Sequence, residues 1–259
     1  MPKHSISWAG TSADTLGVIV TASESNNRPK RKIDIEKIPG RNGDVIFVQD
    51  AWENVERSYE IVAGGKADGS SAVSFRDIAE WLYTPRGYQK LVDSSESGYF
   101  FLAYYAGGFD VENMLTRYGR AEITFNCRPE RFKDSGDITE TISGSSGSRT
   151  YANDTGFPAK PVFIVKGSGE FTLTVSNTAK DAQTVLTITN LASTTYIDCE
   201  TMNVYSGTGV NLNYRVVIVG RIGDKASKEF PVLYPGSNSI SWAGAGVTSV
   251  GIKPRWWTI

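Results

Sequence analysis

The chain has 259 residues, of which 40% are hydrophobic and 21% are charged. This balance excludes an intrinsically disordered protein and favours a folded body with one or two domains. Lys and Arg total 27 against 28 Asp and Glu, so a formal net charge of -1 gives no overall attraction to nucleic acid or to an anionic membrane surface. Any electrostatic partner must be recognised locally.

The cysteines and the N-terminal segment bear on the compartment. The N-terminal sequence MPKHSISWAG lacks the apolar core of a signal peptide, and no uninterrupted apolar run reaches the ~18 residues that span a bilayer. We therefore expect no membrane insertion and no classical secretion. Cys127 and Cys199 each lie on or near an apolar strand in different halves of the chain. This placement predicts two reduced core thiols, as in a protein made in a reducing cytoplasm.

The first elements along the chain read as strands. A short strand and a turn, anchored by Trp8, come first. Asn42-Gly43 in the segment IPGRNGD is a pair typical of tight hairpin turns, because both residues tolerate positive φ. The segments 33–36 and 45–48 therefore predict the two strands of a β-hairpin.

One helix signal follows a further predicted strand at 56–62. Ser74 can cap the first helical turn, and Pro85-Arg86-Gly87 stops the helix. One face of this helix is apolar and is formed by Phe75, Ile78, Ala79 and Leu82. After the helix, two more strands are predicted at 88–93 and 99–105.

The segment from Arg120 to Arg128 alternates without a break between apolar and polar residues. A period of two over this length predicts a half-buried strand, whose polar face must meet water, a lumen or another subunit. Pro129 is expected to end the strand because proline has no N–H to donate. Residues 1–133 thus predict an N-terminal β-sandwich or barrel of about six or seven strands carrying one helix.

A change of composition separates this domain from the rest of the chain. Residues 134–156 are rich in Ser, Gly and Thr and predict a linker with at most one short strand, at 138–142. Residues 157–259 contain short, regularly spaced strand patterns with glycine and asparagine turns and no helix signal. This pattern predicts a C-terminal jelly-roll β-sandwich.

Motifs for catalysis, metals and cofactors are largely missing from the sequence. His4 is the single histidine and lies in a terminus expected to fray, which excludes histidine-dependent catalysis and metal binding. We expect no catalytic residues, no metal and no cofactor. Asp198 and Glu200 share one face of a predicted strand and could form a general acid and base pair, although a solvated strand face is the commoner role for such a pair.

Two surface features could bind ligands. The basic run at 28–32 could contact phosphate, but it lacks interleaved aromatic residues, so a solvated edge or subunit contact is favoured. Trp242, Trp256 and Trp257 could form a platform on which a sugar ring stacks. Adjacent tryptophans in a strand point to opposite sides, so one of Trp256 and Trp257 is expected in the core.

Several segments in order resemble the siphovirus tail component family, the distal tail proteins of long-tailed bacteriophages. The resemblance covers nearly the whole chain, although no single motif is diagnostic. It is carried by IPGRNGD (38–44), WLYTPRGYQKLVDS (81–94), FLAYYAGGFD (101–110), YGRAEITFNCRPERF (118–132), FPVLYPGSNSISWAG (230–244) and IKPRWWTI (252–259).

The resemblance implies a non-enzymatic virion protein of the tail tip, made in the bacterial host cytoplasm. It implies a homohexameric ring between the tail tube protein and a tail-associated hub or receptor-binding protein, with a channel through which DNA passes without specific binding. The N-terminal domain would build the ring, and a galectin-like or carbohydrate-module-like second domain would project from it. Candidate contact residues on the hairpin tip and on the polar strand face are Arg41, Asn42, Asp44, Arg120, Glu122 and Arg128.

Two other functions stay open at this point. A carbohydrate-binding module or adhesin would use Trp242, Trp256 or Trp257 to stack on host glycan, and tryptophan-to-alanine variants on glycan arrays would test it. An enzyme such as a glycoside hydrolase would use Asp198 and Glu200, and unchanged cell-wall substrate would exclude it.

Overall fold

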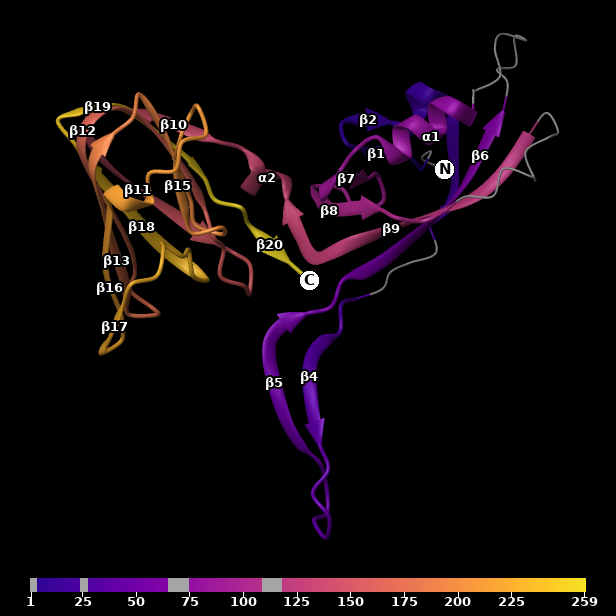
Figure 1. The fold of residues 1–259 in the computed structure, drawn as a ribbon, viewed down its shortest axis with the longest axis horizontal. Helices are drawn as coiled ribbons and strands as arrows, with labels where there is room; N and C mark the ends of the chain where they lie inside the picture. Colours follow the sequence, from indigo (N-terminus) through magenta and orange to yellow (C-terminus); the bar gives the residue numbers. More distant parts are fainter. Residues whose placement is uncertain (1–3, 24–27, 65–74, 109–117) are drawn as a thin grey trace. The chain divides into compact units, whose positions relative to one another are not determined.

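The structure, a computed structural model, describes the chain outside residues 1–3, 24–27, 65–74 and 109–117, and the side chains of 22–23, 63–64, 75 and 118–120 also stay undescribed. The chain is mainly β, as predicted. It divides into two compact units (Figure 1), which are residues 1–131 with Ile259 (unit 1) and residues 132–258 (unit 2).

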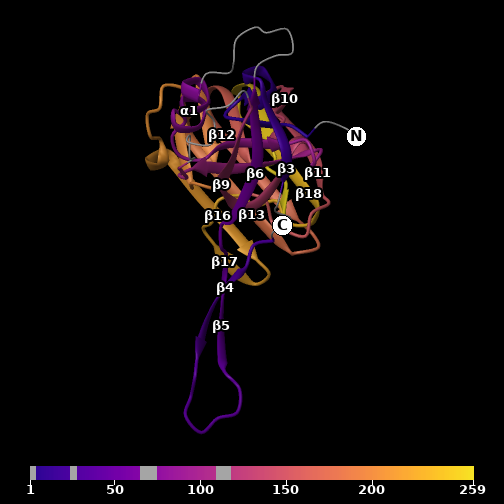
Figure 2. The same ribbon diagram turned by 90° about the vertical axis from the view of Figure 1, so that its right-hand side faces the viewer.

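Unit 1 is built on one sheet with the strand order β2-β1-β7-β8-β9-β6-β3, and Figure 2 shows β3, β6 and β9. The 3-10 helix η1 (Ala13–Leu16) connects β2 to β3. The strands of this sheet are β1 (Ile6–Trp8), β2 (Thr11–Ser12), β3 (Val18–Ser23), β6 (Val55–Gly64), β7 (Gln89–Asp93), β8 (Tyr99–Tyr105) and β9 (Tyr118–Lys133).

The predicted helix is present as α1 (Phe75–Tyr83) and covers the core of unit 1. Ile78 and Leu82 are fully buried, and the Trp81 indole Nε1 donates to the Trp8 carbonyl at 3.3 Å. The helix ends before Pro85, as expected, whereas the proposed cap Ser74 lies outside the described residues. α1 thus provides the one helix expected of the first domain.

The alternation in β9 is confirmed. Ile123, Phe125 and Cys127 are buried, while Glu122 is exposed on the opposite face. The expected end of the strand at Pro129 is wrong, because β9 continues to Lys133. Its ladder with β6 ends at the pair Cys127–Val55, so no β6 carbonyl stands opposite the proline.

The hairpin is also confirmed, as a separate two-stranded sheet formed by β4 (Arg31–Glu36) and β5 (Val45–Trp52). Glu36 pairs with Val45, so the connection is the loop 37–44 and not the tight turn expected at Asn42-Gly43. Gly40 and Gly43 both have positive φ, at 81° and 84°, and the Arg41 N–H donates to the Ile38 carbonyl at 3.2 Å. The loop thus has a turn at Pro39-Gly40 and a bend at Asn42-Gly43, each with a glycine at positive φ.

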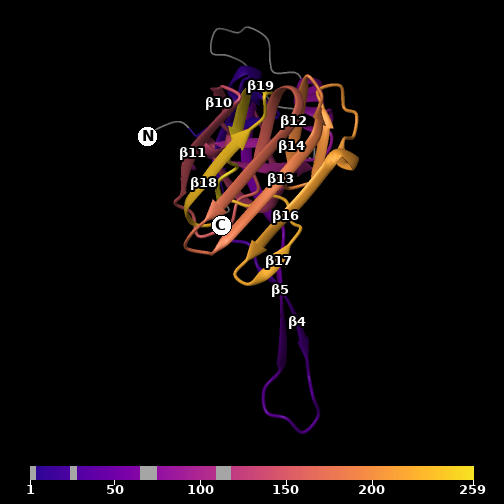
Figure 3. The same cartoon turned by 90° about the vertical axis from the view of Figure 1, so that its left-hand side faces the viewer.

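Unit 2 consists of two sheets that share β12 (Val162–Asn177), and its β-sandwich class agrees with the prediction. One sheet has the order β10-β19-β12-β14-β15, and the other has β11-β18-β12-β13-β16-β17 (Figure 3). The strands of these two sheets are β10 (Glu140–Ser143), β11 (Ser146–Asn153), β13 (Ala182–Leu191), β14 (Thr194–Asp198), β15 (Asn203–Ser206), β16 (Val216–Ile222), β17 (Lys225–Ser227), β18 (Gly236–Ala243) and β19 (Gly246–Lys253), with the 3-10 helix η3 (Asn213–Arg215) before β16. A further short strand, β20 (Trp257–Thr258), lies outside these two sheets.

β12 passes from one sheet to the other at a glycine-rich point. Gly167 has φ 150° and Gly169 has φ 78°, and the ladder registers shift at both positions. A Cβ on Gly167 would lie 2.4 Å from the Gly246 carbonyl oxygen. Glycine is required there because the two backbones approach too closely for a side chain.

The expected linker 134–156 differs from the structure. It contains the short helix α2 (Asp134–Asp137) and the strands β10 and β11, and unit 2 begins at Phe132. β10 pairs with β19, and all of β11 pairs with β18. Small polar residues suit these edge strands because one side of each strand faces solvent, so the composition of an edge resembles that of a linker.

Each unit has its own apolar core, and each core contains one cysteine. Cys127 and Cys199 are both free and buried, which confirms the prediction of reduced core thiols. Within the described part of the chain, no helix combines the length and apolar character needed to cross a bilayer.

Candidate assembly surfaces

The β4–β5 hairpin presents an uncovered aliphatic face. Ile33 pairs with Val48 and Ile35 pairs with Ile46, so these four side chains lie together on one side of the ribbon. Each is between 45% and 58% exposed. Isolated two-stranded hairpins are marginally stable in water, and clustered exposed aliphatic residues mark interaction sites. This aliphatic face is therefore the strongest candidate contact surface in unit 1.

The other face of the hairpin is acidic and aromatic. Asp34 pairs with Phe47, and Glu36 pairs with Val45. The Gln49 Nε2 donates to the Asp34 carboxylate at 2.6 Å, which holds that side chain across the ribbon. The ribbon is thus amphipathic, with carboxylates on the side away from the aliphatic face.

The predicted contact residues of the hairpin tip are all exposed. Arg41, Asn42 and Asp44 lie in the loop 37–44, with exposed side chains. Among described residues, no ion pair involves Arg41 or Asp44. The tip therefore offers both charges to a partner.

The polar face of β9 continues across β6. Glu122 lies directly opposite Glu60, and Ser58 bonds to Thr124 with 2.7 Å between the hydroxyl oxygens. Like charges at directly opposed positions destabilise a sheet. Arg120 lies in β9, but its side chain is outside the described residues.

Reversing the charge of Glu122 is expected to stabilise unit 1. Glu122→Lys replaces a repulsive pair with an attractive one opposite Glu60, which favours folding by about 0.5 kcal/mol. Thermal unfolding at low salt measures the gain, and added salt should reduce it. The neutral variant Glu122→Gln is the control, with an intermediate melting temperature; an unchanged melting temperature for both variants contradicts the repulsion.

Arg128, the remaining predicted contact residue, already has partners. Its Nε and Nη2 donate to the two Glu130 carboxylate oxygens at 3.1 and 3.0 Å. Its guanidinium carbon also lies 6.0 Å from the centre of the Tyr88 ring. Arg128 therefore enters any interface as half of an ion pair.

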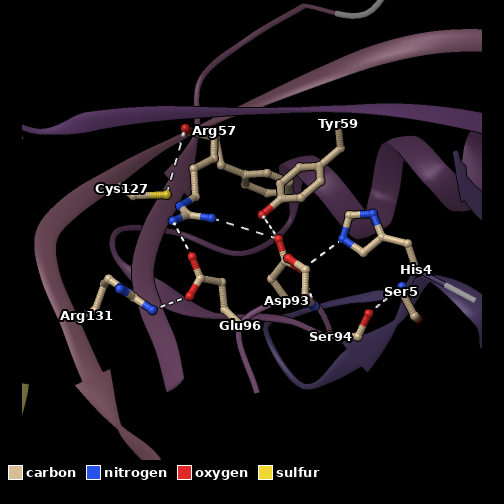
Figure 4. Close-up of polar contacts among 11 residues, drawn as sticks. His4, Ser5, Arg57, Tyr59, Asp93, Ser94, Glu96, Cys127 and Arg131 are labelled. Carbon is tan, nitrogen blue, oxygen red and sulfur yellow. Dashed lines mark hydrogen bonds and ion pairs between the residues drawn. The ribbon is translucent and has the colours of Figure 1, made fainter. Parts of the chain in front are cut away.

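A buried ionic cluster lies on the opposite side of β6 (Figure 4). Arg57 is 3% exposed and Asp93 is 1% exposed, with 3.9 Å between the Nη1 and Oδ2 atoms. Glu96 bridges Arg57, at 3.4 Å, to Arg131. The Arg57 guanidinium also stacks over the Phe101 ring at 3.8 Å. Two arginines and two carboxylates thus share one site within unit 1.

Asp93 is the acceptor at the centre of this cluster. The His4 imidazole donates to it at 2.8 Å and the Tyr59 hydroxyl at 3.0 Å, while the Ser95 backbone N–H and hydroxyl donate at 2.8 and 2.6 Å. Burial raises the pKa of Asp93, but the bonds from Ser95 and His4 outweigh it and hold the pKa below its usual value. The expectation of a frayed His4 is wrong, because this contact ties the N-terminal segment to β7.

The candidate acid and base pair in unit 2 is engaged by an arginine. Arg255 donates to both Asp198 carboxylate oxygens, at 2.7 and 3.2 Å, and lies 3.5 Å from a Glu200 oxygen. Burial raises the pKa of Asp198, but Arg255 and the backbone N–H groups of Glu200 and Thr201 together outweigh it, so the pKa lies below its usual value. A general acid needs the opposite shift, and this arrangement instead tethers the C-terminal segment to β14.

The tryptophans do not form the predicted sugar platform. Trp242 and Trp256 are 4% and 7% exposed and belong to the core of unit 2, so the prediction that they stack on a sugar ring is wrong. Trp257 is half-buried and stacks on Phe157, with 4.4 Å between ring centres. Its indole Nε1 donates to the Pro158 carbonyl at 2.9 Å. Trp256 is buried and Trp257 is half-buried, so the two residues differ in burial as predicted, but neither is on an open surface.

The thiols offer no nucleophile in this arrangement. Burial raises the pKa of Cys127 to about 12 and raises the pKa of Cys199 well above its usual value. Both are thus protonated at neutral pH. Among the described residues, no group of His, Cys, Asp and Glu side chains could hold a metal ion.

Comparison with known proteins finds a solved structure with the same fold. No protein-family model and no curated protein matches the chain. The crystal structure of SPP1 Dit (gp 19.1) superposes with a TM-score of 0.62 and 12% identity, covering 99% of this chain and 99% of that protein. The two proteins share one fold. SPP1 Dit is described as a paradigm of the hub adsorption apparatus in phages that infect Gram-positive bacteria.

A second similar structure is the baseplate of phage P2 in its activated conformation with calcium. It gives a TM-score of 0.47 and 8% identity over 94% of this chain and 98% of the matched chain. The shared fold of SPP1 Dit includes both units, because the alignment omits almost none of either chain.

Proposed function

We propose that this chain is a structural protein of a phage or prophage tail tip, a hub that joins the tail tube to the adsorption proteins. The observation that carries the proposal is the match to SPP1 Dit over 99% of both chains. Both units correspond, so the proposal concerns the whole architecture and not one β domain of a common type.

Self-association into a homohexameric ring is the second part of the proposal. The aliphatic face formed by Ile33, Ile35, Ile46 and Val48 supports it, because a neighbouring copy would remove those side chains from water. The exposed tip residues Arg41, Asn42 and Asp44, with Arg120, Glu122 and Arg128 on β9, are candidate contacts to the next copy or to the tail tube protein.

The acidic strand face suits a channel through which DNA passes. Glu56, Glu60 and Glu122 lie on this side of β6 and β9, and two of them oppose each other. Arg128 lies on the same side, where its charge is paired with Glu130. Carboxylates repel a phosphate backbone, so a lumen with this lining lets DNA through without specific binding. The tail-associated hub or receptor-binding protein would then contact another surface.

The chemistry of the described residues fits a virion component without catalytic activity. Asp198 and Glu200 hold Arg255, and both thiols are protonated. Free buried cysteines also fit synthesis in the bacterial host cytoplasm. A carbohydrate-binding role loses its main support because Trp242 and Trp256 are buried.

Native mass spectrometry over a concentration series, with negative-stain images of the same sample, tests the ring. We expect a closed six-subunit species with a central hole. Ile35→Lys combined with Ile46→Lys should leave only monomers. The two positions oppose each other on the aliphatic face, and a neighbouring copy that covered this face would have to bury two unpaired charges. Phe47→Lys, on the other face of the same strand, is the matched control and should keep the ring.

Purified tail tubes provide the second arm of this experiment. The wild-type chain should bind the end of a tube even where the free ring is weak, and the double-lysine variant should show whether the same face is used. Wild-type chains that stay monomeric at every concentration and also fail to bind tubes would contradict the hub proposal.

A further inference from the structure

One stretch of unit 2 has an unprotected strand edge. β16 pairs with β13 along its whole length, but its other neighbour, β17, pairs only with Gly220–Ile222. The edge of β16 from Val216 to Val219 has no strand partner in unit 2, all of which is described. Figure 3 shows the short β17 beside the longer β16 at the end of this sheet.

The side chains of this edge are apolar. Val217 and Val219 are 55% and 65% exposed, and Val216 and Ile218 on the other side of the strand are only partly buried. The sequence VVIV contains no charge and no proline, the two devices that proteins use to block edge pairing. An edge of this kind is a template for an additional strand.

The edges of unit 2 formed by β10, β11 and β15 are protected. β15 is covered by its own loop, through a bridge between Tyr205 and Asn211. β10 and β11 carry the ion-paired charges Glu140 and Arg149, with 3.5 Å between their nearest atoms. The apolar edge of β16 is therefore a local exception and not a general property of the sandwich.

The two ends of the free edge limit what can pair with it. β17 pairs with Gly220–Ile222, so the free edge ends at Val219, and Arg215 lies at its other end. A second copy pairing along this edge would bring its own β17 with it. In parallel register the two β17 strands would occupy the same place, and in antiparallel register each β17 would meet the residues that precede Val216, which disfavours pairing between copies.

A segment of another protein with acidic ends would bring no second β17 and would meet Arg215 and Arg221 near the ends of the edge. The Arg215 guanidinium donates to the Asn190 carbonyl at 2.9 Å and to the Tyr214 hydroxyl at 2.9 Å, and no carboxylate of unit 2 pairs with it. Arg221 pairs with Asp181 at 2.6 Å, on the exposed surface. An incoming carboxylate would therefore give Arg215 its ionic partner.

We propose that the edge of β16 docks, by strand addition, an extended segment of a second protein in which β-branched apolar residues are bordered by acidic ones. The backbone hydrogen bonds of the new strand supply affinity, Arg215 and Arg221 favour its acidic ends, and β17 limits its length. This site goes beyond the hub function and does not depend on ring formation, because it lies wholly within unit 2.

A synthetic peptide of alternating Val and Thr with Glu at both ends is the probe, and fluorescence anisotropy on the full chain measures its binding. Val217→Lys should weaken binding at least about tenfold, because an exposed lysine blocks the edge. Val217→Thr, which keeps a β-branched side chain, should bind like the wild type. Hydrogen exchange should slow at residues 216–219 when the peptide binds.

The charge preference is tested with the same peptide bordered by Lys, which should bind at least about tenfold more weakly than the Glu-bordered peptide. Equal binding of the two peptides, equal binding to Val217→Lys, or no binding to the wild type would overturn the proposal. So would dimers of the wild type that Val217→Lys abolishes, since they would show a second copy on this edge. Ring formation by the hairpin is unaffected by these outcomes.

Discussion

Replacing Asp93 with alanine is expected to destabilise unit 1 by about 3–5 kcal/mol, the cost of removing one partner from a buried ion pair. The Arg57 guanidinium stays 3% exposed, with only Glu96 left to balance its charge. The Tyr59 hydroxyl and the Ser95 N–H also lose their acceptor inside the protein. The buried Tyr59 hydroxyl adds to the cost because water cannot replace its lost bond, whereas the exposed Ser95 can bond to water instead.

Thermal and denaturant unfolding, followed by probes specific to each unit, measure this effect. The transition of unit 1 should move and that of unit 2 should not. Glu80→Ala is the matched control, because it removes a carboxylate from the exposed pair with Arg76 and should change little. An Asp93→Ala variant as stable as Glu80→Ala would show that the cluster carries no stability.

The same cluster predicts a pH dependence with a defined sign. The folded-state pKa of Asp93 is lowered, so its contribution to stability is complete above the unfolded pKa of about 3.9 and disappears as the pH falls through the folded value. The difference between wild type and Asp93→Ala should therefore be constant near neutral pH and shrink in acid. Denaturant melts from neutral pH down to about pH 2 test this window.

Much of this architecture follows from periodicity in the sequence. The alternation through Ile123, Phe125 and Cys127 predicts the buried face of β9, and Asn42-Gly43 with its flanking strand patterns predicts the hairpin, although not its turn. Apolar spacing likewise identifies α1. These elements are predictable because each buries a face that the local pattern already defines.

The buried cluster was missed, although one signal was present. Arg57 occupies an inward position in the alternating series Val55, Arg57, Tyr59, Ile61, which requires a buried carboxylate opposite it. The partners Asp93 and His4 lie far away in sequence, and only the pairing of β1 with β7 brings them together. Local patterns cannot supply such long-range registers.

The exposed aliphatic face of the hairpin and the β16 edge show a related limit. In both places the sequence pattern of a half-buried strand is correct, but no described residue of the same unit covers the apolar side. A sequence cannot distinguish burial by its own chain from burial by a partner. The structure makes the distinction, and it thereby turns apparent core residues such as Ile35 and Val219 into interaction candidates.

Replacing Trp242 with alanine is expected to destabilise unit 2 by about 3–5 kcal/mol, the range for removing a large aromatic side chain from a core. Trp242 is 4% exposed, and its ring fills the space beside Gly147, where a Cβ would lie 2.5 Å from the nearest ring atom. The Trp242 indole N–H also points at the Gly144 carbonyl, at 3.5 Å. The ring thus joins β18 to the edge strand β11 and to the core.

Gly147→Ala tests the same contact from the other side. The added methyl group would overlap the Trp242 ring, and such overpacking costs about 1–3 kcal/mol. Val219→Ala, at an exposed position on β16, is the control and should change stability by less than about 0.5 kcal/mol. Unfolding of unit 2 by denaturant measures all three variants.

These variants also separate a core role for Trp242 from a sugar-stacking role. A stacking residue removed from a surface platform would lower glycan binding and leave the unfolding transition in place. A core residue does the reverse, lowering stability in every buffer with or without sugar. A Trp242→Ala protein that unfolds like the wild type would contradict a core role for this tryptophan. Such a result would favour the carbohydrate-binding alternative.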